Sequence, residues 1–264
     1  MEAIKVVVQG ALGKMGQTLV GALSDEPGTQ VVGATELEVP SDRLLLPDGV
    51  SQVPFAADLG QILTACRPDV LVDFTVARAT MPAVRLATER GVNLVIGTTG
   101  LSADDISEIE RLATAHRVGA VVAPNFALGA VLMMHLAKIC AKYLDSAEII
   151  ELHHDKKVDA PSGTALATAR EMAAARGRPF QRPEEKSNAQ PSRGAKIEDI
   201  NIHSVRLPGL LAHQEVVFGA PGQTLSLRHD TISRECFMPG VILAVKEVVH
   251  RQGLVYGLDA LLGL

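Results

Sequence analysis

The fold is predicted most directly by residues 4 to 16, Ile4-Lys-Val-Val-Val-Gln-Gly10-Ala-Leu-Gly13-Lys-Met-Gly16. A short β-branched run ends at Gly10, and a helical pattern follows that places Met15, Leu19 and Leu23 on one face. A strand, a glycine turn and a helix in this order form the opening unit of an α/β nucleotide-binding fold.

The glycine turn itself predicts a dinucleotide site. Glycines between a strand and its helix let a pyrophosphate approach the backbone N–H groups at the helix terminus. Leu12 stands where the second glycine of the usual pattern lies, so a tight turn without a nucleotide is the alternative. About 20 residues further on, Glu36 ends the second strand, where this fold places an acid for the ribose hydroxyls. We therefore predict NADH, NADPH or both as cofactor.

Further strands alternate with helices up to residue 122. The expected strands are Gln30–Ala34, Val70–Asp73, Val92–Ile96 and Val118–Val122, with helices at Ala79–Arg90 and Ala103–Ala115 between them. Continuous apolar strands that alternate with helices indicate a parallel sheet covered on both faces. Ala130–Tyr143 then predicts an amphipathic helix with Leu132, Leu136, Ile139, Cys140 and Tyr143 on one stripe.

The pattern changes after this helix. Strands are expected at Ala147–His154, Ile197–Val205, Gln214–Phe218 and Gln223–His229 without crossover helices, which indicates a second, mixed or antiparallel sheet. A final helix, Gly240–Arg251, is expected to pack on the first domain. We predict a dinucleotide-binding domain over 1–124 and 236–264 and a substrate domain over 125–235. The proline-containing segment Arg176–Lys196 is interpreted as a surface connection, with a lid as the alternative.

Composition limits the function classes. The chain has 264 residues, 47% of them hydrophobic and 21% charged, with a formal net charge of −5 and no Trp, which argues against a nucleic-acid binder. Three distant cysteines suggest reduced thiols and no zinc site. The chain shows no signal peptide pattern and no apolar run long enough for a membrane helix. We expect a cytoplasmic protein without a metal.

The segment Glu151-Leu-His-His-Asp-Lys-Lys-Val-Asp-Ala-Pro-Ser-Gly-Thr164 carries the chemistry. Imidazoles and ammonium groups are costly to bury without partners, so this concentration favours a site for an anion over packing. Ser162 or Thr164 is a natural N-cap for the helix that follows, and the N–H groups of its first turn attract a carboxylate or phosphate. A polar, solvated connection between a strand and a helix is the alternative.

Two more loops follow strands of the first domain and are expected to contact the cofactor, because ligands of open α/β sheets bind at the carboxyl ends of the strands. The complete set of predicted cofactor residues is Gly10, Ala11, Leu12, Gly13, Lys14, Met15, Glu36, Gly97, Thr98, Thr99, Pro124, Asn125, Phe126 and Ala127.

These motifs together resemble one family, the dihydrodipicolinate (4-hydroxy-tetrahydrodipicolinate) reductases of diaminopimelate and lysine biosynthesis. The segment Glu151–Thr164 is similar to the signature E-x-H-H-x-x-K-x-D-A-P-S-G-T of that family at every fixed position. The other similar stretches, in order, are Gly10–Gly16, Asp73–Thr75, Gly97–Gly100, Asn125–Phe126, Arg193–Gly194 and Ser204–Glu215.

The resemblance implies an NAD(P)H-dependent reduction of a cyclic dicarboxylic imine to tetrahydrodipicolinate by a homotetramer. It also implies that His153 is the proton donor or acceptor and that Lys157 is a second proton donor. Under the same resemblance the substrate is held by His154, Ser162, Gly163 and Thr164. The second domain would then supply both the substrate site and the subunit contacts.

Two other functions stay open at this stage. Another two-domain nicotinamide dehydrogenase of amino-acid metabolism would share the first domain, but it gives no reason for the arrangement of two histidines and Lys157. A regulator that binds NAD(P) without catalysis would tolerate loss of His153 or Lys157, and both are present. Because Glu36 is followed by Leu37 and not by a basic residue, we expect NADH at least to be accepted.

Overall fold

The computed structural model describes residues 2–181 and 192–264. The chain divides into two compact units, Met1–Leu128 with Arg234–Leu264, and Gly129–Ser233. The middle of the surface connection expected over Arg176–Lys196 lies outside the described residues. No helix in the described part of the chain is long and apolar enough to span a membrane.

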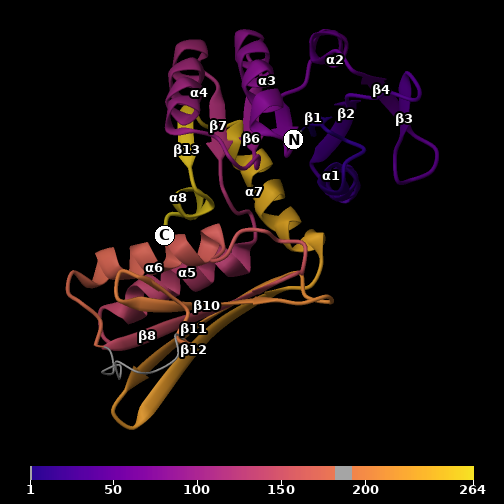
Figure 1. The fold of residues 1–264 in the computed structure, drawn as a ribbon. Coiled ribbons are helices and arrows are strands. Elements are labelled where there is room, and N and C mark those ends of the chain that lie inside the picture. Colours follow the sequence, from indigo (N-terminus) through magenta and orange to yellow (C-terminus); the bar gives the residue numbers. More distant parts are fainter. Residues whose placement is uncertain (1, 182–191) are drawn as a thin grey trace. The chain divides into compact units, whose positions relative to one another are not determined.

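Within the described residues the first unit contains an eight-stranded sheet in the order β13-β7-β6-β5-β1-β2-β4-β3 (Figure 1). Its strands are β1 (Ile4–Gln9), β2 (Thr29–Thr35), β3 (Arg43–Leu45), β4 (Gln52–Ala56), β5 (Val70–Asp73), β6 (Asn93–Ile96), β7 (Gly119–Val122) and β13 (Gly253–Tyr256). Neighbouring strands pair in parallel except β3, which runs antiparallel to β4. The predicted parallel α/β architecture is confirmed. The sequence patterns missed β3, β4 and β13, of which β3 and β13 are sheet edges.

Helices cover both faces of this sheet. They are α1 (Lys14–Asp25), α2 (Leu59–Cys66), α3 (Ala77–Glu89), α4 (Ala103–His116), α7 (Met238–Val248) and α8 (Leu258–Leu262), with a 3-10 turn η1 (Arg234–Phe237) before α7. Helices α2, α3 and α4 pack on one face, and α1 and α7 contact the strands and each other on the other. Val6, Val7 and Val8 are therefore all fully buried, which explains the unbroken apolar run.

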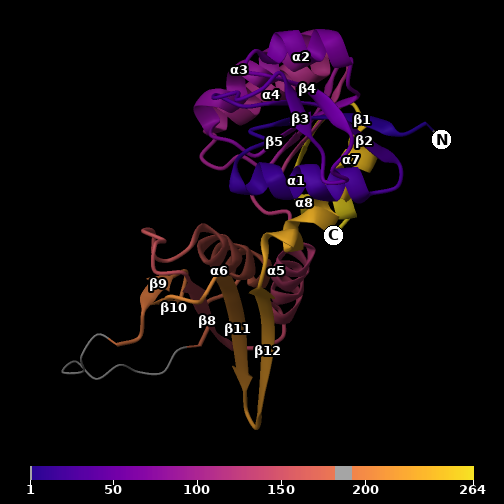
Figure 2. The same cartoon turned by 90° about the vertical axis from the view of Figure 1, so that its right-hand side faces the viewer.

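The second unit contains a mixed sheet in the order β12-β11-β8-β10-β9 within the described residues. Its strands are β8 (Ser146–His153), β9 (Ala195–Ile197), β10 (Ile200–Arg206), β11 (Ala212–Ala220) and β12 (Gln223–Thr231). Among the strands described in this unit, β8 and β10 pair in parallel and the other neighbours are antiparallel. Helices α5 (Leu128–Ala141) and α6 (Gly163–Arg176) lie side by side on one face, and Figure 2 shows the long β11–β12 hairpin. The predicted second sheet is confirmed.

The buried face of α5 is not the one that its apolar stripe suggests. Of the five residues predicted on that stripe, Leu132, Leu136, Ile139 and Tyr143 are between 41% and 76% exposed, and Tyr143 lies beyond the end of α5. Cys140 alone of the five packs against the core cluster of the second unit. The residues that pack inward are smaller on average, namely Ala130, Val131, Met133, Ala137 and Ala141. Ala137 and Ala141 join the core cluster that α6 completes with Ala165, Ala169 and Met172. The small side chains of Ala137 and Ala141 let the two helices and the sheet approach closely, so side-chain size as well as hydrophobicity determines the inner face.

Candidate active site

The glycine turn between β1 and α1 is held by backbone hydrogen bonds to the end of β2. Gly10 has a φ of +75°, which favours glycine, and the N–H groups of Gly10 and Ala11 both donate to the carbonyl of Thr35. A Cβ on Gly16 would lie 2.0 Å from the carbonyl oxygen of Gly10, so the turn can pack over the first turn of α1 only because residue 16 is glycine. The side chain of Leu12, which stands in place of the second glycine, is 37% exposed.

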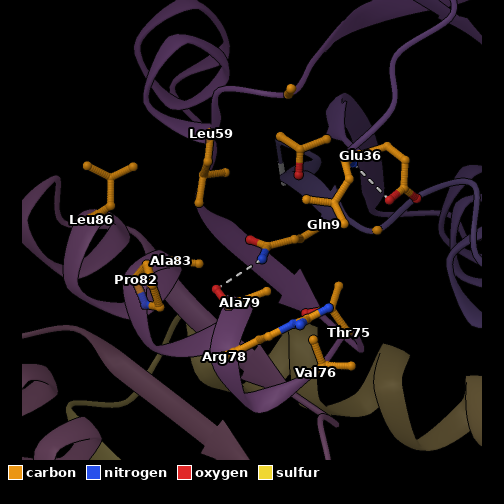
Figure 3. A pocket seen from close by; sticks show the side chains of 14 residues that line it. Gln9, Glu36, Leu59, Thr75, Val76, Arg78, Ala79, Pro82, Ala83 and Leu86 are labelled. Atoms are coloured by element: carbon orange, nitrogen blue, oxygen red, sulfur yellow. Dashed lines mark hydrogen bonds between the residues drawn. The ribbon is translucent and has the colours of Figure 1, made fainter.

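Glu36 lies beside this turn. Its carboxylate accepts hydrogen bonds from the backbone N–H of Leu12 at 3.1 Å and of Leu37 at 3.0 Å. Glu36 and Gly10 line a cavity of 370 Å³ together with Thr75, Val76 and Arg78 from the connection between β5 and α3 and its first turn (Figure 3). Apolar side chains of α2 and α3, among them Leu59 and Pro82, close the far side. The shape, the apolar wall and the carboxylate fit the adenosine half of a dinucleotide.

The remaining predicted cofactor residues lie at the same edge of the sheet. Gly97–Thr99 follow β6 and Pro124–Ala127 follow β7, so both loops are at carboxyl ends of parallel strands. Thr98 is buried and hydrogen-bonds to Thr80, and the ring of Phe126 packs 5.2 Å from that of Phe74. Neither loop lines the cavity described above. The sequence prediction omitted Thr75, Val76 and Arg78, although they follow β5 at the same edge and the carboxyl-end rule applies to them equally.

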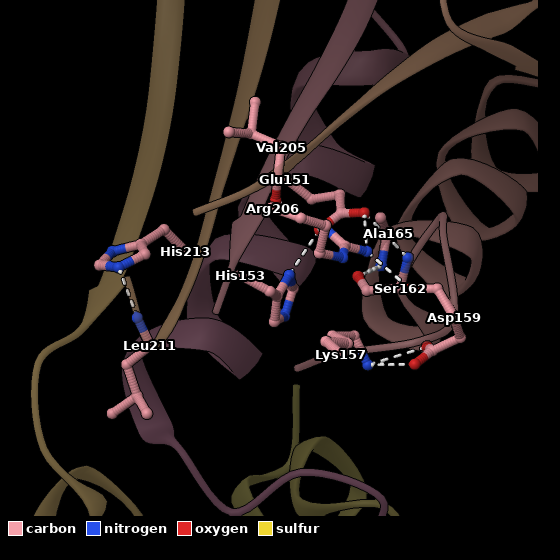
Figure 4. Close-up of polar contacts among 10 residues, drawn as sticks. All are labelled: Glu151, His153, Lys157, Asp159, Ser162, Ala165, Val205, Arg206, Leu211 and His213. Carbon is pink, nitrogen blue, oxygen red and sulfur yellow. Dashed lines mark hydrogen bonds and ion pairs between the residues drawn. The ribbon is translucent and has the colours of Figure 1, made fainter. Parts of the chain in front are cut away.

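In the second unit, the end of β8 joins the start of α6 to form a polar cluster (Figure 4). Nδ1 of His153 lies 2.5 Å from a carboxylate oxygen of Glu151, whose side chain is fully buried. Arg206, at the end of the neighbouring strand β10, pairs with both oxygens of the same carboxylate at 2.8 Å. The parallel register, which aligns Arg206 with His153, brings the guanidinium to this point.

The turn after β8 brings Lys157 and the start of α6 into the same cluster. The backbone N–H of Lys157 donates to the carbonyl of His154, and its ammonium group lies 2.8 Å from the carboxylate of Asp159. Ser162 is the N-cap of α6, since its hydroxyl accepts from the N–H of Ala165. The backbone at Gly163 faces open space, because a Cβ built there would meet no atom within 4 Å. Thr164 follows in the first helical turn.

The charges of the cluster are set by burial and by one another. Burial opposes ionisation of Glu151, but hydrogen bonds from Arg206, Ser204 and His153 outweigh it and lower the pKa of this carboxyl. Burial lowers the pKa of His153, and the positive charges of Lys157 and Arg206 act in the same direction against the hydrogen bond with Glu151. The hydrogen bond from Lys157 is the main cause of the lowered pKa of Asp159. The site thus combines a readily deprotonated imidazole, two cations and a helix N-terminus.

These observations define the class: a nicotinamide-dinucleotide oxidoreductase with a Rossmann-type domain and a second, α+β domain. The family models agree with this class. Residues 4–126 match "Dihydrodipicolinate reductase, N-terminus" and residues 129–262 match "Dihydrodipicolinate reductase, C-terminus". The chain therefore belongs to the dihydrodipicolinate reductase family, and the resemblance inferred from the sequence is confirmed.

Individual relatives agree over the full length. The 4-hydroxy-tetrahydrodipicolinate reductase of Dehalococcoides mccartyi strain CBDB1 is 57% identical over 264 residues, with complete coverage of both chains. That of Moorella thermoacetica is 50% identical and covers 98% of each chain. A solved structure, dipicolinate-bound dihydrodipicolinate reductase from Paenisporosarcina sp. TG-14, is 40% identical with a TM-score of 0.86 over 97% of this chain and 98% of that one. An amine dehydrogenase from Mycobacterium smegmatis, 17% identical with a TM-score of 0.66 over 97% of this chain and 95% of that one, shares the fold.

Proposed function

We propose that this chain reduces 4-hydroxy-tetrahydrodipicolinate to tetrahydrodipicolinate with NADH or NADPH, as a step of diaminopimelate and lysine biosynthesis. The observation that carries the proposal is the convergence of His153, Lys157 and the N-terminus of α6 at one end of the second sheet. The full-length identity to reductases that carry this name supports the same activity. The domain roles follow, with dinucleotide binding in the first unit and substrate binding in the second.

His153 is proposed as the proton donor. Addition of hydride to a conjugated imine leaves an electron-rich carbon that must be protonated, and an imidazole suits this step near neutral pH. The carboxylate of Glu151 accepts a hydrogen bond from Nδ1, so Nε2 is the nitrogen left for exchange with substrate. Because burial lowers the pKa of His153, its protonated form gives up a proton more readily than an exposed histidine.

Lys157 and the start of α6 are proposed to hold the carboxylates of the substrate. The ammonium group of Lys157 neutralises negative charge and is a second proton donor. Ser162, Gly163 and Thr164 present the first turn of α6, whose N–H groups and dipole favour an anion. The half-buried His154 completes the proposed set of substrate residues.

The first unit is proposed to hold the nicotinamide cofactor through the turn Gly10–Gly16, Glu36 and the two loops after β6 and β7. The reduced nicotinamide supplies the hydride when it is bound. Leu37, which follows Glu36, is 84% exposed and apolar, so it offers no cation to a 2′-phosphate. NADH is therefore proposed to be accepted, and the ratio of kcat/KM for NADH and NADPH with one substrate preparation measures the preference.

A cytoplasmic homotetramer is proposed as the working form. The face of the second sheet opposite α5 and α6 carries Ile150, Leu152 and Val217, which are half-buried and covered by no described helix. Apolar side chains on a sheet face favour contact with another subunit. Light scattering after gel filtration measures the mass, and a monomer at micromolar concentration contradicts this part of the proposal.

The decisive test supplies the condensation product of pyruvate and aspartate semialdehyde to the purified chain. We expect oxidation of NADH or NADPH, followed at 340 nm, that depends on this product. Pyruvate alone and aspartate semialdehyde alone are the controls. Absence of substrate-dependent turnover with both cofactors would reject the proposed activity.

A further inference from the structure

We infer that Arg206, through its ion pair with the buried Glu151, is a positioning residue that fixes the orientation of His153 and holds the turn carrying Lys157. The inference rests on the proposed role of His153 as proton donor and adds two residues to which the sequence analysis gave no function.

Both oxygens of Glu151 are fully engaged. Oε2 accepts from Arg206 Nη1 at 2.8 Å and lies 2.5 Å from His153 Nδ1, while Oε1 accepts from Arg206 Nη2 at 2.8 Å and from the backbone N–H of Ser162 at 3.2 Å. An ionised carboxylate is only an acceptor, so Nδ1 of His153 must carry the hydrogen. The neutral imidazole is thereby fixed in the Nδ1–H tautomer, and Nε2 is left to exchange a proton with the substrate.

The same pair ties the α6 end of the turn between β8 and α6 back to the sheet. Arg206 Nη2 also donates to the carbonyl of Asp159 at 2.6 Å, and Glu151 holds the N–H of Ser162 (Figure 4). Asp159 in turn contacts the ammonium group of Lys157 at 2.8 Å. One guanidinium and one carboxylate therefore set the positions of the imidazole, the ammonium group and the N-cap of α6.

Arg206 also limits how far the carboxylate of Glu151 raises the pKa of His153. A buried carboxylate without a cation would retain a proton on the neighbouring imidazole and raise its pKa. The bidentate guanidinium, 18% exposed, balances that charge. The charged groups around His153 are Glu151 on its own strand, Arg206 on β10 and Lys157 in the turn, while β11 presents Ala212 opposite it. Loss of Arg206 leaves Glu151 unbalanced, so the pKa of His153 is expected to rise.

The test compares Arg206→Met, which removes both the charge and the bidentate hydrogen bonds, with Arg206→Lys, which keeps only the charge. For Arg206→Met we expect kcat to fall on the order of tenfold to a hundredfold and the pKa of His153 to rise by about one unit. For Arg206→Lys we expect a pKa close to that of the parent protein but a smaller kcat, because a point charge cannot make the bidentate pair. Arg178→Met, which removes an exposed arginine of the same unit, is the matched control and should change neither.

Two measurements keep the outcome unambiguous. The pKa and tautomer of His153 are read from imidazole ¹⁵N shifts, assigned with His153→Gln, and circular dichroism establishes that each variant is folded. A folded Arg206→Met protein with an unchanged pKa and unchanged kcat overturns the inference. If Arg206→Met does not fold, a folded Arg206→Lys protein with the parent kcat overturns it equally. The NMR titration needs no turnover, so failure of the proposed reaction is distinguishable from failure of this inference.

Discussion

Two buried carboxyl groups, one in each unit, lie at or near the end of a strand, and their pKa values are shifted in opposite directions. Asp73 ends β5 and Glu151 lies near the end of β8, and both are almost completely inaccessible. Burial raises the pKa of Asp73, and hydrogen bonds from Thr75, Thr80 and Thr98 reduce the effect without reversing it. Burial also opposes ionisation of Glu151, but there the hydrogen bonds, chiefly from Arg206, reverse the effect.

Burial alone therefore does not determine the charge of a carboxyl group. At Asp73, hydroxyl groups and a backbone N–H contact Oδ1, while the buried Oδ2 has no hydrogen-bond partner among the described residues. These neutral groups do not compensate the desolvation of a charge, whereas the bidentate guanidinium at Glu151 does. The backbone N–H and the hydroxyl of Thr75 both donate to Oδ1 of Asp73, which fixes the start of the loop after β5. The hydroxyl of Thr98 lies 3.5 Å from the same oxygen. Glu151 is held as an anion beside an imidazole. The first arrangement suits a structural role and the second suits acid–base chemistry.

The largest expected effect separates chemistry from cofactor binding. His153→Ala removes the imidazole that Glu151 orients, and we expect kcat to fall by about 10² to 10⁴. The dissociation constant of NADH, measured by fluorescence titration, should stay unchanged, because the predicted dinucleotide residues belong to the other unit. A variant that loses NADH affinity while keeping kcat would contradict the assignment of chemistry to the Glu151 region.

The next effect concerns stability. Arg206→Met leaves Glu151 buried without its cation, and breaking such a pair costs about 3 kcal/mol of the free energy of unfolding. Urea denaturation followed by circular dichroism at pH 7 measures the loss. Glu151→Gln combined with Arg206→Met should recover part of it, since the buried charge is then absent. Equal stability of the single and double variants would show that the charge of Glu151 does not cause the loss.

A ligand effect of similar size is expected at the second unit. Pyridine-2,6-dicarboxylate, a planar dianion, should bind near Lys157 and α6 and stabilise the native protein by about 2.7 kcal/mol at one hundred times its dissociation constant. A rise in Tm with the dicarboxylate but a smaller one with benzoate, which has a single carboxylate, is the expected result. No shift at millimolar ligand would count against a dicarboxylate site.

The smallest effect is expected for Asp73→Asn. A carboxyl group whose folded pKa lies above its ordinary value of 3.8 lowers stability once it ionises, so its cost appears as pH rises through that value and the folded pKa. The variant should therefore gain stability relative to the parent between pH 4 and pH 7, by about 1 kcal/mol or less.

Glu151→Gln should change stability with the opposite sign. The ionised Glu151 stabilises the fold above its ordinary pKa of 4.5, and this contribution is lost as the pH falls through the lower pKa of the folded state. Urea denaturation of each variant and of the parent at pH 4 and at pH 7 measures the free energy of unfolding.

Much of the fold was predictable because its signals are local. Val6–Val8, Gly10 and Gly16 predict a buried strand and a close turn, and both are observed. The inner face of α5 was not predictable, because the choice between Leu136 and Ala137 depends on the space that α6 and the sheet leave. The strands β3 and β13 are short edge strands, which hydrophobic periodicity describes poorly.

Short motifs in the chain were enough to predict the family, the alternation of strands and helices and the proposed site residues His153, Lys157 and Ser162, because each of these depends on residues that are neighbours in the sequence. The pairing of Arg206 with Glu151, 55 positions away, is visible only in the folded chain. The same holds for the choice among the three loops at one edge of the sheet: the loop after β5, and neither the loop after β6 nor that after β7, lines the cavity beside Glu36. The physical reason is that strand pairing, here β8 with β10 and β1 with β5, creates contacts between residues whose spacing carries no periodic signal. The charge of a buried group depends on those contacts.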